Sequence, residues 1–157
     1  MKKIYLAGSC SKEERNRMEE IAAALRAKGY KVYCPFEFKL PNAWDYSQET
    51  WARHVFKADV AAIDDCDMMV MISKGRNSTA GTNWEQGYAY AQNKPIFVFQ
   101  YTNDETSLMT YSGCTRFINL PAETEEVDIP TCVAEYPYEI WIRSRNRGLN
   151  QCTTILT

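Results

Sequence analysis

The sequence lacks the features that would place it among polyanion-binding or membrane proteins. Its 157 residues carry 18 Lys and Arg against 20 Asp and Glu, so no positive excess is present to neutralise nucleic-acid phosphates. The apolar run near the amino terminus is too short for a signal peptide or a membrane span. We therefore expect a small-molecule substrate, with neither a nucleic-acid polymer nor a membrane as partner.

Metal-ligand spacing is absent as well. The six cysteines are scattered without a C-x-x-C pair, and His54 is the only histidine. The sequence therefore predicts no metal site, and His54 is interpreted as a packing or surface residue of a helix. Free thiols in or beside strands are typical of a reducing compartment, so we expect a cytoplasmic protein.

The length and composition fit one globular domain covering residues 1–157. Hydrophobic residues make up 45% of the chain and charged residues 24%, as in an ordinary folded protein, and no segment is of low complexity. From residue 121 onward acidic, aromatic and basic stretches follow one another. This tail has no clear assignment; a final strand or helix and a segment that reaches a neighbouring subunit both fit it.

Strands and helices alternate along the first 120 residues. Strands are predicted at residues 3–7, 30–34, 67–73, 95–100 and 115–120, and helices at about 11–29, 47–65, 83–92 and 107–111. The run at 67–73, DMMVMIS, is nearly continuously apolar, which is typical of a central parallel strand. The alternation predicts a doubly wound α/β fold, with a flavodoxin-like five-stranded parallel sheet and helices on both faces.

The loops of such a sheet predict where a ligand binds. Residues 8–11, 74–82 and 102–107 follow predicted strands and should meet at the carboxyl edge, where ligands of this fold class bind. The segment after the second strand is rich in aromatic residues. Phe36, Trp44 and Trp51 either stack on a ligand there or pack against protein, which is the more usual role of such side chains.

Glu85 is the carboxylate best placed for chemistry. It lies one turn into a predicted helix that follows a Gly-containing loop, where a covalent nucleophile or a general base would face the crevice. The same residues also fit a T-x-x-E capping box, in which Glu85 and Thr82 only satisfy the start of the helix. Spacing alone leaves both interpretations open and favours the capping box.

At this point the sequence resembles a known family, the nucleoside 2-deoxyribosyltransferases and the related deoxynucleoside 5'-monophosphate N-hydrolases. The resemblance rests on IYLAGS at 4–9, ADVAAIDDCDMMVMI at 58–72, AGTNWEQGYAYAQNKPI at 80–96 and SLMTYSG at 107–113. It implies a retaining double displacement in which Glu85 attacks the anomeric carbon and a base or water completes the reaction. No metal or organic cofactor is implied.

The resemblance also implies two helpers for Glu85. Asp59 matches an aspartate that assists the departing nucleobase; otherwise it is one solvated charge of an acidic helix. Tyr5 matches a tyrosine that hydrogen-bonds the nucleophile; otherwise it fills the core. The remaining substrate contacts are carried over by position onto six residues: Gly8, Ser9, Thr79, Gly81, Ser107 and Met109.

The 5' end of the sugar separates two substrate classes. Transferases that act on free nucleosides carry an aspartate where this chain has Thr79 and an asparagine where it has Ser107. Hydroxyl groups can donate to phosphate oxygens that a carboxylate would repel, so the substitutions favour a monophosphate. Against this, the hydrolases carry arginine where this chain has Ser11. Lys74 or Arg76 could supply the charge, although solvated loop charges are the more ordinary interpretation.

The sequence therefore predicts an enzyme that cleaves deoxyribosyl N-glycosidic bonds and takes a nucleoside or nucleotide and a nucleobase as small-molecule partners. Transfer to another base, in a nucleotide salvage role, is the first interpretation. Hydrolysis of a monophosphate and a non-catalytic nucleotide sensor remain alternatives. A phosphoacceptor receiver domain is disfavoured because the first strand ends without an acidic pair for magnesium. By resemblance, a homodimer or larger homo-oligomer is expected.

Overall fold

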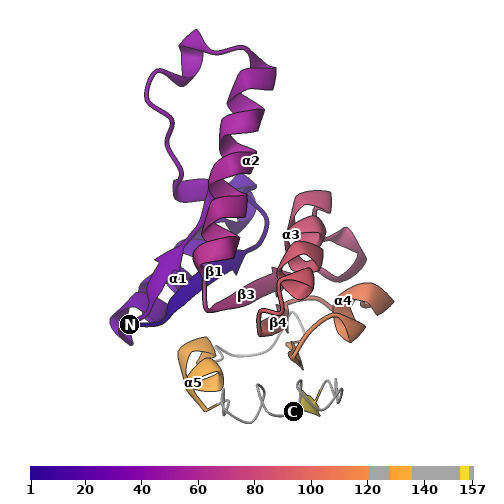
Figure 1. Ribbon diagram of the computed structural model, residues 1–157. Helices are drawn as coiled ribbons and strands as arrows, with labels where there is room; N and C mark the ends of the chain where they lie inside the picture. Colours follow the sequence, from indigo (N-terminus) through magenta and orange to yellow (C-terminus); the bar gives the residue numbers. More distant parts are fainter. Residues whose placement is uncertain (121–127, 136–152, 156–157) are drawn as a thin grey trace.

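The fold was analysed in a computed structural model that describes residues 1–120, 128–135 and 153–155 (Figure 1). All the strands lie in one parallel sheet, ordered β2-β1-β3-β4-β5-β6. The strands are β1 (Lys3–Ala7), β2 (Lys31–Tyr33), β3 (Met68–Ser73), β4 (Ile96–Gln100), β5 (Arg116–Asn119) and β6 (Thr153–Ile155). The first five strands have the flavodoxin-like order, which confirms the predicted fold class.

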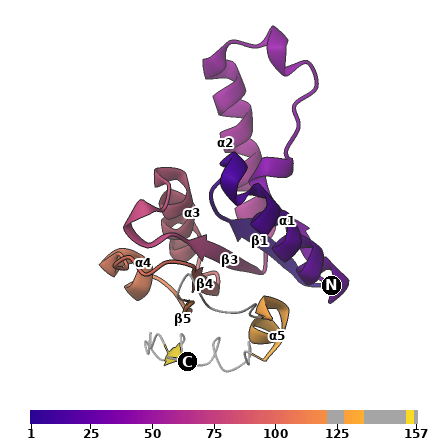
Figure 2. The ribbon, with the colours of Figure 1, turned by 180° about the vertical axis from the view of Figure 1, so that it is seen from behind.

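Helices connect the strands and cover both faces of the sheet. The α-helices are α1 (Lys12–Ala27), α2 (Gln48–Asp65), α3 (Ala80–Ala91), α4 (Leu108–Ser112) and α5 (Ile129–Ala134). Short 3-10 helices occur at Pro35–Glu37, Ala43–Asp45 and Gly75–Asn77. Helices α1 and α5 pack on one face, as the view from behind shows, whereas α2 and α3 pack on the other (Figures 1 and 2).

The alternation of side chains along each strand divides the core into two clusters. Ile4 and Leu6 of β1 face α1, whereas Tyr5 and Ala7 face α2 and α3. Strand β3 is buried at every position and contributes to both clusters in the same alternating way. The apolar run at residues 67–73 therefore forms a central parallel strand that is covered on both faces, as predicted.

Two elements differ in extent from the prediction. Strand β2 is an edge strand of only three residues, because Pro35 follows it closely and offers no N–H for pairing. Helix α3 begins at Ala80, three residues earlier than expected, because the Thr79 side chain accepts a hydrogen bond from Thr82 N–H and caps the helix. This earlier start changes the position of Glu85 within its helix.

The tail contributes two short elements. Helix α5 begins after Asp128, whose side chain accepts from Thr131 N–H, and packs on the α1 face. Strand β6 pairs in parallel with β5 and extends the sheet by one strand beyond the predicted five. The remaining predicted features of the tail lie outside the described residues.

Helix α2 extends beyond the carboxyl edge of the sheet (Figure 1). Its lower half packs on β1 and α3, while its upper half and the segment before it rise above the carboxyl edge (Figure 1). Ser47 caps the helix by accepting from Thr50 N–H. The helix therefore forms one wall above the strand ends.

Candidate active site

A cavity of about 490 Å³ lies at the carboxyl edge of the sheet. The first loop, the segment after β2, the middle of α2 and the start of α3 form its walls. Its lining residues are Gly8, Ser9, Cys10, Ser11, Pro35, Phe36, Phe38, Trp51, Val55, Asp59, Thr79, Gly81, Thr82 and Glu85. The cavity therefore occupies the edge at which the fold class predicts a ligand.

Glu85 lines this cavity and is held from below by the sheet. The Tyr5 hydroxyl donates a hydrogen bond to Glu85 Oε1 at 2.8 Å. Tyr5 is fully buried in β1, so its ring is fixed by the core and its hydroxyl reaches the cavity only through Glu85. One carboxylate oxygen of Glu85 is therefore oriented by a rigid donor.

The capping-box interpretation of Glu85 is not supported. Thr79 is the N-cap of α3, so Glu85 is the sixth residue of the helix instead of the third. Its carboxylate contacts Tyr5, which is 80 residues away in sequence, and not the amide groups at the helix start. Thr82 is buried beneath the first turn, where its hydroxyl bonds that of Thr79 at 2.7 Å.

Asp59 lies across the same cavity on α2. The Tyr33 hydroxyl donates a hydrogen bond to Asp59 Oδ1 at 2.9 Å. Asp59 is half-buried, so it is not a fully solvated helix charge. Two carboxylates, each held by a tyrosine of the sheet, therefore line one cavity.

Burial raises the pKa values of both acids. Burial raises the pKa of Glu85 to about 7; the Tyr5 hydrogen bond opposes this rise, and the charge of Asp59 adds to it. Burial also raises the pKa of Asp59, against the hydrogen bond from Tyr33. The pKa of Tyr5 is raised by burial and then by Glu85, so its phenol keeps its proton. Glu85 is thus an acid that titrates near neutral pH.

Gly8 allows the first loop, which lines the cavity, to lie close to α1. A Cβ atom at this position would lie 2.7 Å from Met18 Sδ and Cε in α1. The loop therefore packs directly on α1, which leaves Ser9 on the cavity wall with its Oγ accepting from Ser11 N–H at 3.2 Å. Gly81 lines the opposite wall, where a Cβ would meet nothing within 4 Å.

Ser107 and Met109 lie elsewhere in this chain. They line a separate hollow of about 340 Å³ between α3 and α4, together with Asn83, Gln86 and Tyr90. Met109 is 81% exposed. Within one chain, Ser107 therefore shares no described hollow with Ser9 and Thr79, although their loops were expected to meet at the carboxyl edge.

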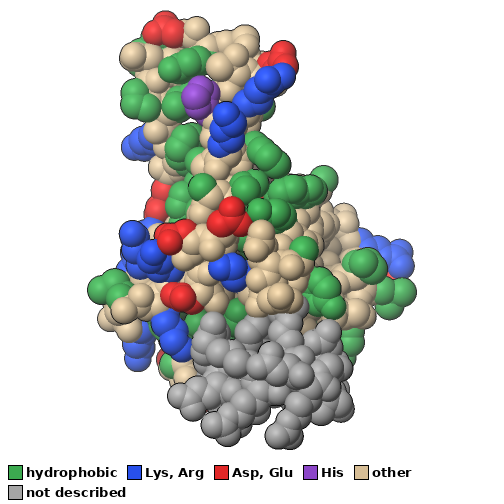
Figure 3. All heavy atoms as spheres, viewed as in Figure 1, with side chains coloured by type: hydrophobic (Ala, Val, Ile, Leu, Met, Phe, Trp, Pro, Cys, Tyr) green, Lys and Arg blue, Asp and Glu red, His purple; other side chains and the backbone are tan. Residues whose placement is uncertain are grey.

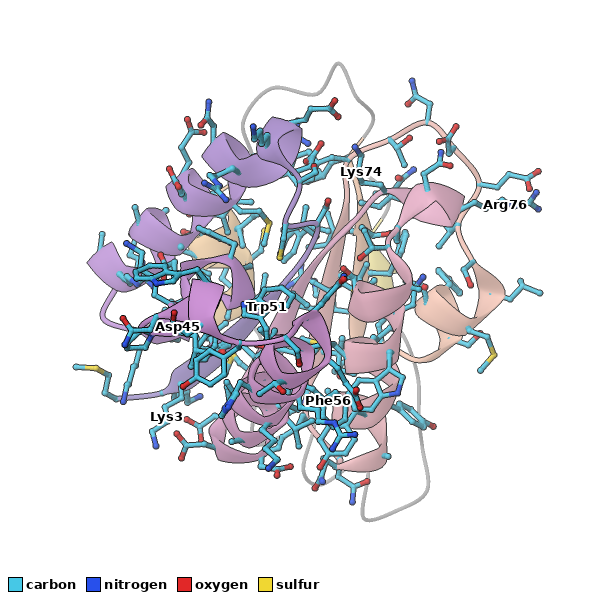
Figure 4. The ribbon with its side chains drawn as sticks, turned by 90° about the horizontal axis from the view of Figure 1, so that it is seen from above. Lys3, Asp45, Trp51, Phe56, Lys74 and Arg76 are labelled. Atoms are coloured by element: carbon cyan, nitrogen blue, oxygen red, sulfur yellow. The ribbon has the colours of Figure 1, made fainter. Side chains whose placement is uncertain are left out.

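The two loop cations are engaged outside the cavity. Lys74 Nζ lies 2.9 Å from Glu14 Oε1, and Arg76 forms an ion pair with Glu105. Arg76 points away from the body of the molecule (Figure 4). Neither residue lines the cavity, in keeping with their interpretation as ordinary loop charges.

The aromatic residues separate into two groups. Phe36 and Trp51 line the cavity, and Figure 4 shows Trp51 among the elements that converge there. Trp44 is 83% exposed and lines no described cavity. His54 is exposed and packs edge-on against Tyr46, with ring centroids 5.4 Å apart, as expected for a surface residue.

A second hollow of about 410 Å³ adjoins the first between α2 and α3. It shares the wall formed by Asp59 and Glu85, and Phe56 and Trp84 close its far side, with ring centroids 5.2 Å apart. Hydrophobic side chains gather over this part of the surface in Figure 3. The two carboxylates are therefore accessible from both hollows.

Several residues that line the cavity or bond to its acids were missed by sequence reasoning, among them Tyr33, which bonds Asp59. Tyr33 is the most informative, because only the pairing of β1 with β2 places it beside Tyr5. Its ring stacks on that of Tyr5 with centroids 5.5 Å apart. The sequence offers one signal, a tyrosine within each of the first two predicted strands, but strand register is not readable from it.

The described residues contain no group of three or more His, Cys, Asp or Glu side chains that could hold a metal ion. The five described cysteines are free thiols: Cys10, Cys34, Cys66, Cys114 and Cys132. Within the same part of the chain, no helix combines the length and the apolar character that crossing a bilayer requires.

A flavodoxin-like sheet with two tyrosine-held acids at its carboxyl edge defines an α/β protein of the class that binds small molecules at this edge. The family model for nucleoside 2-deoxyribosyltransferase matches residues 4–149. The chain therefore belongs to the nucleoside 2-deoxyribosyltransferase family. Membership supports an enzyme that acts on an N-glycosyl bond, by transfer or by hydrolysis.

Solved structures agree with this assignment. A 2-deoxyribosyltransferase from Bacillus psychrosaccharolyticus is 28% identical, with a TM-score of 0.71 over 88% of this chain and 95% of that one. A CMP N-glycosidase from Clostridium botulinum shares the fold at 21% identity, with a TM-score of 0.53 over 71% of this chain and 80% of that one. A conserved protein from Enterococcus faecalis is 25% identical, with a TM-score of 0.55 over 66% and 65%. No curated protein matches the chain.

Proposed function

We propose that this protein cleaves the N-glycosidic bond of 2'-deoxyribonucleosides or their 5'-monophosphates and transfers the deoxyribosyl group to another nucleobase. The observation that carries the proposal is the Glu85 carboxylate on the cavity wall, oriented by Tyr5 and titrating near neutral pH. A buried carboxylate with one fixed oxygen is suited to attack a neighbouring electrophilic carbon.

The proposed reaction begins with a bond exchange at the anomeric carbon. Glu85 forms an ester bond to C1', the C1'–N bond breaks, and its electron pair passes to the nucleobase. Asp59 gives a proton to the departing base, which its raised pKa favours. The oxocarbenium character of the transition state is stabilised by the nearby anion of Glu85.

The second half-reaction restores the enzyme. An acceptor nucleobase attacks C1', the ester bond breaks, and Glu85 regains its carboxylate while Asp59 takes up the proton of the acceptor. Phe36 and Trp51 offer flat apolar surfaces on which a base can stack within the cavity. No metal or organic cofactor takes part in these steps.

Hydrolysis of a 5'-monophosphate is the second candidate. Thr79 and Ser9 line the cavity with hydroxyl groups, and neither adds a negative charge that would repel a phosphate. The base leaves as the 5-phosphodeoxyribosyl ester forms on Glu85, and water then attacks C1' and releases deoxyribose 5-phosphate and the Glu85 carboxylate, with Asp59 taking up the proton of the water. The two candidates share Glu85, Asp59 and Tyr5 and differ only in the acceptor and the 5' group.

A product analysis separates these candidates. The protein is incubated with deoxynucleosides and with deoxynucleoside monophosphates, each with and without a second base, and the products are separated by chromatography. A new nucleoside or nucleotide indicates transfer, and free base formed without an acceptor indicates hydrolysis. If neither product forms, the chain is a non-catalytic nucleotide sensor and the proposal fails.

Substitution of the nucleophile tests the mechanism. Glu85→Ala is expected to lower turnover by about 10⁴-fold or more, because no covalent intermediate can form. Glu49→Ala is the matched control, since Glu49 is an exposed residue of α2 that pairs with Arg53 and lines no described cavity. Mass spectrometry of acid-quenched wild-type protein should detect a deoxyribosyl adduct on Glu85. Normal turnover in Glu85→Ala would reject the mechanism.

A homo-oligomer forms part of the proposal. Ser107 and the exposed Met109 lie on α4 or at its start, away from the cavity of their own chain. In a dimer or larger assembly they could reach the cavity of a neighbour. Sedimentation velocity is expected to show an oligomer, and a monomer with full activity would remove Ser107 and Met109 from the site.

A further inference from the structure

Tyr33 occupies a position that makes it more than a packing residue. It is the last residue of β2, and its hydroxyl donates to Asp59 Oδ1 at 2.9 Å. Strand register pairs Tyr33 with Tyr5 of β1, whose hydroxyl donates to Glu85 Oε1 at 2.8 Å. Each of the two carboxylates therefore has its own tyrosine donor, and the donors are neighbours in the sheet.

The two tyrosines stabilise each other's orientation. Their rings are stacked, with centroids 5.5 Å apart and planes inclined by 23°. Tyr5 is fully buried, and Tyr33 packs against the same core cluster while remaining partly exposed. A tyrosine has only two side-chain torsions, so packing on the ring fixes the position of its hydroxyl closely.

We propose that Tyr33 is a positioning residue that holds Asp59 in the orientation needed to protonate the departing nucleobase. This inference rests on the proposed function of Asp59. Asp59 lies on the wall shared by both hollows and is half-buried, so its carboxyl group has space to rotate. The bond from Tyr33 ties down Oδ1 and leaves Oδ2 as the oxygen available to the base.

The groups around Asp59 determine what the loss of this bond would do. Tyr33 of β2 bonds its carboxyl group, and the charge of Asp59 in turn raises the pKa values of Tyr5 in β1, Glu85 in α3 and Cys10 in the first loop. Burial raises the pKa of Asp59, and the hydrogen bond from Tyr33 is the influence that lowers it. Removing the hydroxyl of Tyr33 should therefore raise the pKa of Asp59 as well as release its carboxyl group.

Two substrates with different leaving groups test the role of Tyr33. A natural deoxynucleotide or deoxynucleoside cleaved by the wild type needs a proton on its departing base, whereas p-nitrophenyl 2-deoxyriboside expels a stable phenolate that needs none. In both, Glu85 forms the bond to C1'. Tyr33→Phe keeps the ring stack and deletes only the hydroxyl. It should lower kcat on the natural substrate about 30-fold, with KM within about twofold, and change p-nitrophenol release less than threefold.

The chain offers a matched control. The hydroxyl of Tyr88 donates a hydrogen bond to Asp64 Oδ1 at 2.9 Å. This bond also joins a tyrosine to an aspartate of α2, but neither residue lines a described hollow. Tyr88→Phe should leave both activities unchanged. In an Asp59→Asn background, Tyr33→Phe should cause no further loss on the natural substrate, because the group that it positions no longer supplies a proton.

The pH profile gives an independent readout. Asp59 donates only in its protonated form, so its pKa sets one limb of the pH profile of kcat/KM on the natural substrate. Tyr33→Phe should move that limb to higher pH, since the hydrogen bond that favours the ionised form is gone. Because Asp59 and Glu85 interact, the limb belongs to the pair, and its shift is compared with that in Tyr88→Phe.

The outcomes separate the two hypotheses. If wild-type protein cleaves neither substrate, the proposed function fails, and the inference about Tyr33 fails with it. If wild type cleaves both and Tyr33→Phe lowers both by the same factor, Tyr33 is merely structural. The inference is equally overturned if Tyr33→Phe lowers neither, or if its loss persists undiminished in the Asp59→Asn background.

Discussion

The two faces of the central sheet serve different purposes. Under α1 and α5 the buried cluster consists of aliphatic residues, Met, Phe and one Cys, with Ile4 and Leu6 as the contribution of β1. Under α2 and α3 the same strand presents Tyr5, whose hydroxyl reaches a carboxylate. A single strand thus supplies hydrocarbon to one face and a hydrogen-bond donor to the other.

This difference teaches how a small domain combines a stable core with reactive groups. Buried carboxylates favour their neutral form unless donors and space for a ligand surround them. On α1 the buried carboxylate of Glu14 is paired with Arg17 and Lys74, whereas the α2–α3 face keeps Glu85 and Asp59 beside tyrosine hydroxyls and a cavity at the edge where the strands end. Substitutions on the two faces should therefore affect different properties.

Among the substitutions that compare the two faces, Leu6→Ala should have the largest effect, and it should appear in stability. Leu6 is fully buried on the α1 face, so truncation removes apolar contacts and leaves a cavity. The free energy of unfolding should fall by about 3 kcal/mol, measured by urea denaturation. Activity per folded molecule should stay within about twofold. A large loss of activity in fully folded protein would remove the contrast between the faces.

Tyr5→Phe should have the opposite signature. The ring stays in place, but Glu85 loses its donor, so activity at pH 7 should fall about 30-fold while the thermal midpoint changes little. The Tyr5 bond also opposes the rise in the pKa of Glu85 to about 7. Its loss should move the acidic limb of the pH profile to higher pH. An unchanged limb would show that Tyr5 does not act on Glu85.

Thr79→Asp sharpens the comparison within the active face. Aspartate caps a helix as well as threonine does, so α3 should form normally. The added charge should lower kcat/KM for monophosphates about 10-fold more than it lowers kcat/KM for free nucleosides, measured by steady-state kinetics. Ser47→Asp, at the cap of α2, is the matched control. Equal effects on both substrate classes would remove the argument for a phosphate near Thr79.

Glu85→Gln should show that the active face lowers stability. The pKa of Glu85 is about 7 in the fold against an ordinary value of 4.5, so the folded state binds more protons between these values. The contribution of Glu85 to stability is therefore present below about pH 4.5 and is lost as pH rises through 7. The thermal midpoint of the variant minus that of the wild type should therefore be about 3 °C higher at pH 8 than at pH 4.5. If the thermal midpoints of variant and wild type change with pH in parallel, the Glu85 carboxylate is solvated by water and its burial does not lower stability.

Arg15→Gln should give the smallest effect. Burial raises the pKa of the Cys10 thiol on the cavity wall, and so do Glu85 and Asp59, whereas the charge of Arg15 lowers it. Arg15 is therefore close enough to act on this wall. KM for monophosphates should rise about threefold, with no change for free nucleosides. Arg53→Gln, which removes an exposed charge of α2, is the control and should raise neither KM.

Much of the fold was readable from the pattern of residues. The alternation of apolar runs with helical periodicity predicted a doubly wound sheet of five parallel strands, which the structure contains, and Gly29, with a φ of 88°, follows the first helix where its end was expected. The start of α3 was misplaced, because Ser-Thr-Ala-Gly-Thr offers more than one capping hydroxyl. Strand β6 was left unassigned, because its pairing with β5 depends on partners distant in sequence.

The candidate site was only partly readable. Resemblance to the family pointed to Glu85, Asp59 and Tyr5; in the structure Glu85 and Asp59 line one cavity, and Tyr5 bonds Glu85 from beneath it. Spacing alone had favoured a helix cap for Glu85. Tyr33 was missed, because a tyrosine in a short edge strand has no sequence signal that distinguishes a donor from a packing residue.

The sequence by itself determined the class of fold and the polarity of its two faces, because side-chain alternation and helical periodicity are local properties of the chain. Only the tertiary structure decided which groups meet. Strand register stacks Tyr5 on Tyr33, and the packing of α2 and α3 on the sheet lays Asp59 and Glu85 against those hydroxyls. Burial then raises the pKa of both acids, which no sequence pattern states, because a pKa depends on everything that surrounds the group.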